Sequence, residues 1–109
     1  MDAVVVAPRQ GEIWWLEVAE EAKARPVLVV TRDEAIGVLR RLVVAPVTTT
    51  LRRARSQLPL GRAEGLPVES VGNFDSLTTV PKSLLVRRLG SLGARHQELG
   101  ATLRAMADC

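Results

Sequence analysis

The segment Pro26-Val27-Leu28-Val29-Val30-Thr31 carries the strongest structural signal in this chain. Its run of β-branched and aliphatic residues is typical of a strand that is buried on both faces. Pro26 disfavours helix at the preceding residue, Arg25, and favours an extended conformation there. We therefore predict a loop that ends at Arg25-Pro26, followed by a buried central strand.

Similar, shorter patterns precede and follow this segment in the sequence. Residues 11–18 predict a strand in which the adjacent side chains of Trp14 and Trp15 point to opposite faces. Leu42–Thr50 predict another, with hydroxyl side chains alternating between its faces at the end, and Asp33–Val38 predict a helical turn or loop. The remaining predicted strands are short: Leu58–Leu60 (as an edge), Glu69–Asn73, Leu77–Val80 and Leu85–Leu89.

A helical pattern replaces the strand pattern after Gly93. His96, Leu99, Leu103 and Met106 form one apolar stripe at helical spacing, which predicts a terminal helix with Gly93 at its N-cap position. We interpret His96 as a partly buried helix residue rather than a general base.

Six or so short strands followed by a helix predict a mainly β fold, a small curved antiparallel barrel with a C-terminal helix. The length of 109 residues predicts one domain, residues 1–109.

Composition argues against several classes of protein. The longest uncharged stretch, Leu42–Leu51, is much shorter than the roughly 20 apolar residues that cross a bilayer, and the N-terminal residues lack the pattern of a secretory signal. Cys109 and His96 are the only cysteine and histidine, so they do not make an internal disulfide or a zinc site of the usual ligand types. The default expectation is a reduced, cytosolic protein without metal or cofactor.

Positive charge is concentrated in the middle of the chain. Residues 25–62 carry eight arginines against two acidic residues, whereas residues 1–24 have a net charge of −3 and residues 63–109 a net charge of zero. Guanidinium groups bind phosphate in a bidentate manner. Two interpretations stay open: a solvated surface that is rich in arginine, or an anionic partner bound by this middle segment.

Candidate catalytic groups are few. The chain has no Ser-His-Asp set, no paired histidines and no glycine-rich phosphate loop. Arg25, at the start of the central strand, and Thr48, near the end of the next one, provide a guanidinium and a hydroxyl that together suit a phosphate.

Four segments of the chain form a recognisable pattern: Arg9-Gln10-Gly11-Glu12-Ile13-Trp14-Trp15, Arg25-Pro26-Val27-Leu28-Val29-Val30-Thr31, Val44-Ala45-Pro46-Val47-Thr48-Thr49, and Ser70–Leu85 with Asp75, Thr79, Lys82 and Ser83. In this order they resemble the MazF/PemK family of toxin endoribonucleases. The resemblance covers about residues 9–105 and implies a compact PemK/CcdB-like (SH3-like) barrel that forms a homodimer. It also implies metal-independent cleavage of single-stranded RNA at a short sequence, and a cognate MazE-like antitoxin that occupies the RNA site.

Arg25 and Thr48 match the two catalytic positions of this family. The 2′-OH of RNA would act as the nucleophile, leaving a 2′,3′-cyclic phosphate and a 5′-OH. Guanidinium groups stay charged in proteins, so we expect Arg25 mainly to stabilise transition-state charge, with proton transfer as a further option, and Thr48 to donate a hydrogen bond to the same phosphate. The predicted RNA contacts are Thr49, Arg52, Arg53, Arg55, Asp75, Ser76 and Lys82.

Two departures from the family pattern leave base specificity open. The loop Glu17–Ala24 is short, and Ser76 stands where a glutamine often follows the aspartate.

Two other functions also stay open. A gyrase poison of the CcdB type would need a C-terminal Trp-Gly-Ile tail, whereas this chain ends Met106-Ala107-Asp108-Cys109. A non-catalytic small-barrel binding module would use the same basic segment and would tolerate lysine in place of Arg25.

Overall fold

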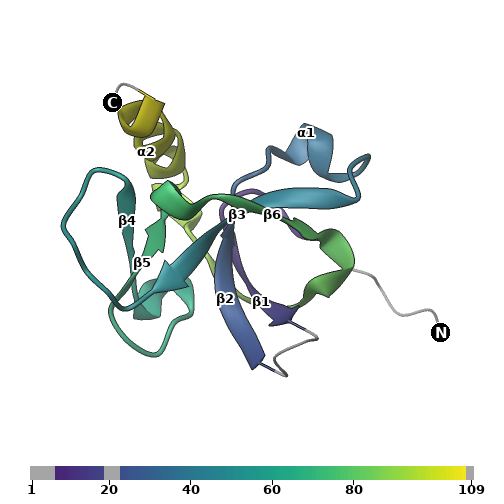
Figure 1. The fold of residues 1–109 in the computed structure, drawn as a ribbon, viewed down its shortest axis with the longest axis horizontal. Helices are drawn as coiled ribbons and strands as arrows, with labels where there is room; N and C mark the ends of the chain where they lie inside the picture. Colours follow the sequence, from purple (N-terminus) through teal and green to yellow (C-terminus); the bar gives the residue numbers. More distant parts are fainter. Residues whose placement is uncertain (1–6, 19–22, 108–109) are drawn as a thin grey trace.

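The computed structural model describes residues 7–18 and 23–107, and in these residues seven strands form one strongly bent antiparallel sheet (Figure 1). The sheet order is β4-β5-β3-β2-β1-β7, and β6 pairs with β3 beside this path. The strands are β1 (Glu12–Val18), β2 (Lys23–Val29), β3 (Arg41–Thr48), β4 (Gln57–Leu60), β5 (Ser70–Asn73), β6 (Thr78–Pro81) and β7 (Leu85–Ser91). The helices are α1 (Asp33–Ile36) and α2 (Gln97–Ala107), with short 3-10 turns η1 (Arg62–Glu64), η2 (Phe74–Ser76), η3 (Lys82–Leu84) and η4 (Gly93–Arg95).

The β1–β2 hairpin extends further than the sequence predicts. Glu17 pairs with Ala24 and Leu16 pairs with Arg25, so the prediction of a loop that ends at Arg25-Pro26 is wrong. Proline is tolerated in a strand that has a partner on one side only, and β3 pairs with β2 only from Val27 onward. Arg25 therefore lies within β2. Residues 19–22 of the predicted loop lie outside the described residues.

Strand β3 changes its neighbour part-way along its length. Val44 pairs with Thr78 of β6, whereas Val47 pairs with Gly72 of β5. The turn η2 separates these two partner strands, and it buries Phe74 while leaving the two residues after it exposed. The change of partner thus curls the sheet and presents a polar turn near the end of β3.

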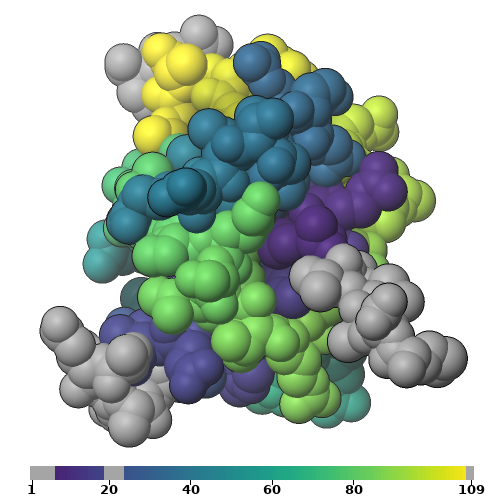
Figure 2. Space-filling model, turned by 90° about the vertical axis from the view of Figure 1, so that its right-hand side faces the viewer, coloured from purple at the N-terminus to yellow at the C-terminus, as the bar shows by residue number. Residues whose placement is uncertain are grey.

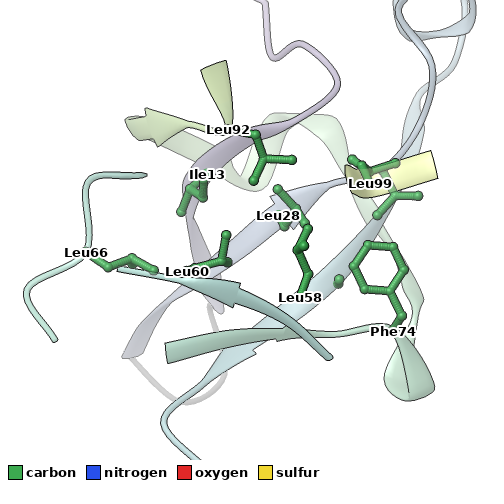
Figure 3. Close-up of a cluster of buried hydrophobic side chains, with 10 residues drawn as sticks. Ile13, Leu28, Leu58, Leu60, Leu66, Phe74, Leu92 and Leu99 are labelled. Carbon is green, nitrogen blue, oxygen red and sulfur yellow. The ribbon is translucent and has the colours of Figure 1, made fainter. Parts of the chain in front are cut away.

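Both faces of the sheet are covered by apolar side chains. One cluster, drawn in Figure 3, packs this sheet against α2 and contains Ile13, Leu28, Leu58, Phe74 and Leu99. The opposite face carries a second cluster that includes Trp14, Val27, Val29, Ile36, Leu42, Val44, Val80 and Leu85. Figure 2 shows α1 and the segment from β6 into η3 lying over this side of the molecule.

The two adjacent tryptophans behave as predicted. Trp14 is 5% exposed and belongs to the second cluster, with its indole nitrogen 3.0 Å from Glu12 Oε1. Trp15 is half-buried and lines a pocket on the other face.

The C-terminal helix confirms most of the predicted stripe. Leu99 is 2% exposed, and Leu103 and Met106 pack against the first cluster. The prediction for His96 is wrong, because the helix begins only at Gln97 and the imidazole is exposed. The turn η4 carries the ring back over Gly11, where Nε2 lies 3.0 Å from Gln10 Oε1. No helix in the described part of the chain is long and apolar enough to cross a membrane.

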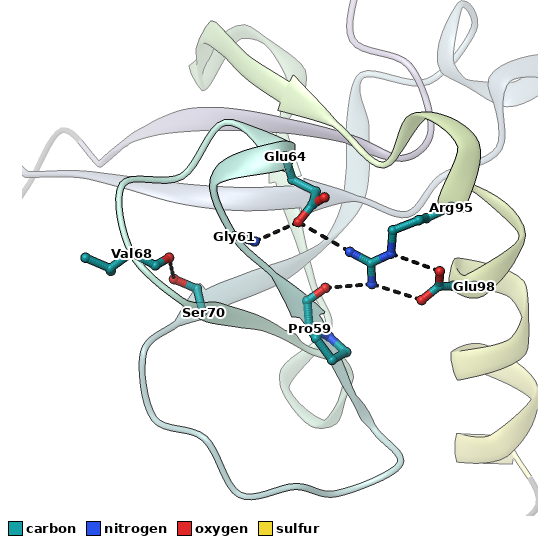
Figure 4. Close-up of polar contacts among 7 residues, drawn as sticks. All are labelled: Pro59, Gly61, Glu64, Val68, Ser70, Arg95 and Glu98. Carbon is teal, nitrogen blue, oxygen red and sulfur yellow. Dashed lines mark hydrogen bonds and ion pairs between the residues drawn. The ribbon is translucent and has the colours of Figure 1, made fainter.

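An ionic cluster joins α2 to the segment around η1 (Figure 4). The Arg95 guanidinium donates to both oxygens of Glu98 at 2.9 Å each and to the Pro59 carbonyl at 2.8 Å, and it lies 3.3 Å from Glu64 Oε1. Glu64 is 5% exposed and also accepts the Gly61 N–H at 2.7 Å. The hydrogen bonds from Arg95 lower the pKa of Glu98, and those to Glu98 raise the pKa of Arg95.

The same segment packs tightly against β7. Gly65 has φ = 92°, and a Cβ atom there would overlap the Leu89 carbonyl. A Cβ atom on Gly90 would overlap the Glu64 carbonyl in turn. Two glycines from separate elements therefore permit the backbone contact that the ionic cluster reinforces.

Candidate active site

The register of β2 and β3 brings Arg25 and Thr48 to one pocket. Val27 pairs with Pro46, and Arg25 and Thr48 each lie two residues beyond this pair toward the same end of the sheet. Because side chains two residues apart in a strand share a face, both reach the same side. The pocket has a volume of about 380 Å³ and is lined by Leu16, Val18, Arg25, Pro26, Val27, Pro46, Val47, Thr48 and Thr78.

The walls of this pocket suit an anion. Arg25 is exposed and contributes a positive charge, while Leu16, Val27 and Pro46 supply apolar surface around it. Apolar walls reduce the screening of a charge by water, so a guanidinium attracts a phosphate more strongly there than on an open surface. No carboxylate is among the described residues that line the pocket.

Thr48 is half-buried and its hydroxyl has a defined partner. Thr48 Oγ1 accepts the backbone N–H of Thr50 at 3.1 Å. A hydroxyl that accepts such a bond retains its own hydrogen for donation. The geometry therefore suits Thr48 to donate to an oxygen in the pocket.

A second, more polar pocket of about 230 Å³ adjoins Thr48. It brings Arg52 and Ser76, two of the predicted RNA contacts, close to Thr48. The other lining residues are Pro46, Thr50, Gln57 and Asn73. Ser76 Oγ accepts from Asn73 Nδ2 at 3.3 Å, while the Asp75 carboxylate is turned to Ser56 Oγ at 2.6 Å. In this structure Asp75 holds the turn η2 against the start of β4.

The other predicted RNA contacts are more scattered. Arg53 and Arg55 are exposed in the loop between β3 and β4, where Arg53 has φ = 55°. Thr49 lines an apolar pocket of about 470 Å³ together with Trp15 and Leu66. Leu66 belongs to the first apolar cluster, and Trp15 lies on the same face of the sheet as that cluster.

Lys82 lies far from the pocket of Arg25 and Thr48. Its Nζ donates to the Ile36 carbonyl at 2.8 Å and so caps the end of α1. It shares a hollow with Arg40 and Arg41 at the beginning of β3. Since Thr48 ends the same strand, about 23 Å of extended chain separates it from Arg41. The structure does not bring Lys82 together with the other site residues.

The sequence reasoning did not single out Thr78 or Gln57. Thr78 could have been found from strand alternation, because it shares a face with the buried Val80 two residues later. Gln57 carries no such signal, since its contacts depend on the loop between β3 and β4.

A polar cluster near the N-terminal end of β1 has a structural role. Asp33 accepts the Gln10 N–H at 2.8 Å and an Arg9 guanidinium N–H at 3.3 Å, and these bonds lower the pKa of Asp33. Gln10 also donates to the Val30 carbonyl at 2.9 Å. In the part of the chain that the structure describes, no three His, Cys, Asp or Glu side chains are grouped so that they could hold a metal ion.

Comparison with known proteins assigns the family. A family model described as PemK-like, MazF-like toxin of type II toxin-antitoxin system matches residues 9–107. The chain belongs to this family. This MazF-family chain is 42% identical over 104 residues to the probable endoribonuclease MazF5 of Mycobacterium tuberculosis, and the match covers 94% of both chains.

Solved structures of MazF proteins agree with this assignment. The toxin MazF-mt6 of Mycobacterium tuberculosis matches with a TM-score of 0.78 and 33% identity, over 89% of this chain and 96% of that one. A mycobacterial endoribonuclease, solved in complex with its cognate antitoxin, shares the fold with a TM-score of 0.76 at 23% identity, over 91% and 93% of the two chains. The predicted family and barrel fold are confirmed. These matches do not favour the gyrase poison or the binding module.

Proposed function

We propose that this MazF-family toxin cleaves single-stranded RNA at a short sequence, with Arg25 and Thr48 as its catalytic residues. One observation carries the proposal: β2 and β3 place these two side chains, which match the catalytic positions of the family, on one pocket. The relatives that are named endoribonucleases support the same reaction class.

The reaction uses a nucleophile that RNA supplies. The 2′-oxygen forms a bond to the adjacent phosphorus, and the bond from phosphorus to the 5′-oxygen of the next nucleotide breaks. The 2′-OH proton passes to water, and the departing 5′-oxygen takes a proton from water. The products are a 2′,3′-cyclic phosphate and a 5′-OH.

Arg25 and Thr48 act on the phosphate. The guanidinium binds the non-bridging oxygens, whose negative charge increases in the transition state, and the Thr48 hydroxyl donates a hydrogen bond to the same group. Together they hold the phosphorus in line with the 2′-oxygen and the leaving oxygen. Neither group is a strong base, so we expect a modest catalyst. Because RNA supplies the nucleophile itself, the proposed reaction requires no metal-bound water.

The proposal includes two protein partners. A homodimer frames the RNA site, and a cognate MazE-like antitoxin occupies that site and inhibits cleavage. Complexes of relatives with antitoxins support the second partner. Sedimentation of the purified chain at micromolar concentration tests the first, because a monomer that still cleaves RNA contradicts it.

The decisive experiment maps the ends of RNA that the purified protein cleaves. We expect new 5′-OH ends at one enriched sequence motif, in the presence of excess EDTA. A substrate with 2′-deoxyribose at the cut position should bind and stay intact. Loss of cleavage in EDTA contradicts the metal-independent mechanism. If no new ends appear, the proposal that this protein is an endoribonuclease is contradicted. That result favours the gyrase poison or the binding module.

A further inference from the structure

Gln57 is a buried polar residue outside the pocket of Arg25 and Thr48. It is the first residue of β4 and is 8% exposed. Its Oε1 accepts the Arg52 N–H at 2.7 Å, and its Nε2 donates to the Thr50 carbonyl at 3.2 Å. Both ends of the side-chain amide are thus used to hold the loop that follows β3.

These contacts continue to the candidate catalytic hydroxyl. The residue whose carbonyl Gln57 binds, Thr50, donates its own backbone N–H to Thr48 Oγ1 at 3.1 Å. A chain of hydrogen bonds therefore runs from the Arg52 N–H through Gln57 and Thr50 to Thr48. Arg52, Gln57, Thr50 and Thr48 also line the second pocket together.

We propose that Gln57 is a positioning residue that acts through Thr48, an inference that rests on the proposed function. By fixing the carbonyl of Thr50, Gln57 keeps the Thr50 N–H directed at Thr48 Oγ1. This bond occupies an acceptor site of the hydroxyl and holds its rotation, so that the O–H hydrogen is directed to the phosphate. Without Gln57, the loop and the hydroxyl lose this orientation before the substrate binds.

Two substitutions separate the two ends of the Gln57 side chain. Glutamate keeps an acceptor for the Arg52 N–H but has no donor for the Thr50 carbonyl. For Gln57→Glu we therefore expect kcat to fall by about tenfold at saturating RNA, since small misplacements of a catalytic group are costly, and KM to rise as well, because the added carboxylate lies beside Arg52. Gln57→Met removes both bonds, so kcat should fall similarly and RNA binding should also weaken, because the loop that carries Arg52 is released. The matched control is Gln97→Glu, an exposed glutamine in α2, which should match the wild type.

A double-mutant cycle distinguishes positioning from a structural effect. Single-turnover cleavage is measured for wild type, Gln57→Glu, Thr48→Val and the double variant. If Gln57 acts through the hydroxyl, Gln57→Glu should have no further effect in the Thr48→Val background. A tenfold loss in both backgrounds overturns the inference. A wild type that does not cleave RNA, or a Thr48→Val variant with full activity, contradicts the proposed function instead.

Amide hydrogen exchange supplies a readout that does not depend on activity. In the wild type the Thr50 and Arg52 N–H groups should be protected. Gln57→Glu should accelerate exchange at Thr50 and largely preserve protection at Arg52, whereas Gln57→Met should accelerate both. Unchanged exchange at Thr50 in both variants overturns the inference, even if their activities fall.

Discussion

Arg95 and Arg25 occupy contrasting environments in this small barrel. Arg95 lies where η4 meets α2, and its guanidinium binds Glu98, Glu64 and the Pro59 carbonyl (Figure 4). Arg25 lies within β2, at a pocket whose other described walls are apolar or carry hydroxyls. A guanidinium that is surrounded by carboxylates holds elements together, whereas one that lines a pocket contributes positive charge to that pocket. The neighbours of an arginine, more than its residue type, therefore indicate its role.

Substitution of Arg25 should cause the greatest change, a loss of turnover with almost no change in stability. Arg25→Ala should lower turnover by about 10²–10³-fold, or roughly 2.7–4 kcal/mol, because it removes a donor whose value is greatest in the transition state. RNA affinity should fall much less, and the thermal unfolding midpoint should stay close to that of the wild type because Arg25 is exposed. Single-turnover kinetics and RNA titration provide the measurements.

Two further variants sharpen the assignment of Arg25. Arg25→Lys keeps the charge but loses the bidentate geometry, so it should restore binding and little of the rate. His96→Ala is the control, since the ring contacts Gln10 and does not line the pocket. If His96→Ala abolishes turnover in a folded protein while Arg25→Ala preserves it, the active site is placed wrongly.

Substitution of Arg95 should instead lower the free energy of unfolding and leave turnover unchanged. Among the described residues, Arg95→Ala leaves the buried Glu64 carboxylate with the Gly61 N–H as its remaining hydrogen-bond donor, which should cost about 1–3 kcal/mol of unfolding free energy. Turnover at a temperature where the variant is folded should be unchanged. Arg104→Ala, at an exposed position on α2, is the matched control and should lie within about 0.5 kcal/mol of the wild type. Denaturant unfolding measures both, and equal stabilities contradict a structural role for Arg95.

The smallest expected effect concerns acid stability. Hydrogen bonds from Arg95 lower the pKa of Glu98 in the folded state, so its ionised form adds stability above the ordinary glutamate pKa. This contribution is lost as the pH falls from the ordinary glutamate pKa through the lowered folded-state pKa of Glu98. Glu98→Gln should therefore lose less stability than the wild type between neutral and acidic pH. Unfolding curves at several pH values test this, and parallel pH profiles contradict it.

Much of the fold could be predicted from local patterns. The alternation through Trp14 and Trp15, the aliphatic run after Pro26 and the stripe of α2 correspond to real elements, because each depends on burial of one strand or helix face. The predictions from the sequence are wrong where a local preference competes with contacts between separate segments. Pro26 indicates the end of a loop, yet cross-strand pairing extends β2 back to Lys23. His96 fits the helical spacing, yet η4 moves the start of α2 beyond it.

The candidate site divides in the same way. Local sequence patterns are enough to predict the family resemblance, the strand segments and the two side chains, Arg25 and Thr48, that suit a phosphate. The three-dimensional fold sets which other groups surround these two side chains. It placed Thr78 and Gln57 near Thr48 and turned Lys82 toward α1. Strand patterns depend on neighbours within a few residues, whereas these contacts depend on register and loop closure between separate segments, which no local pattern encodes.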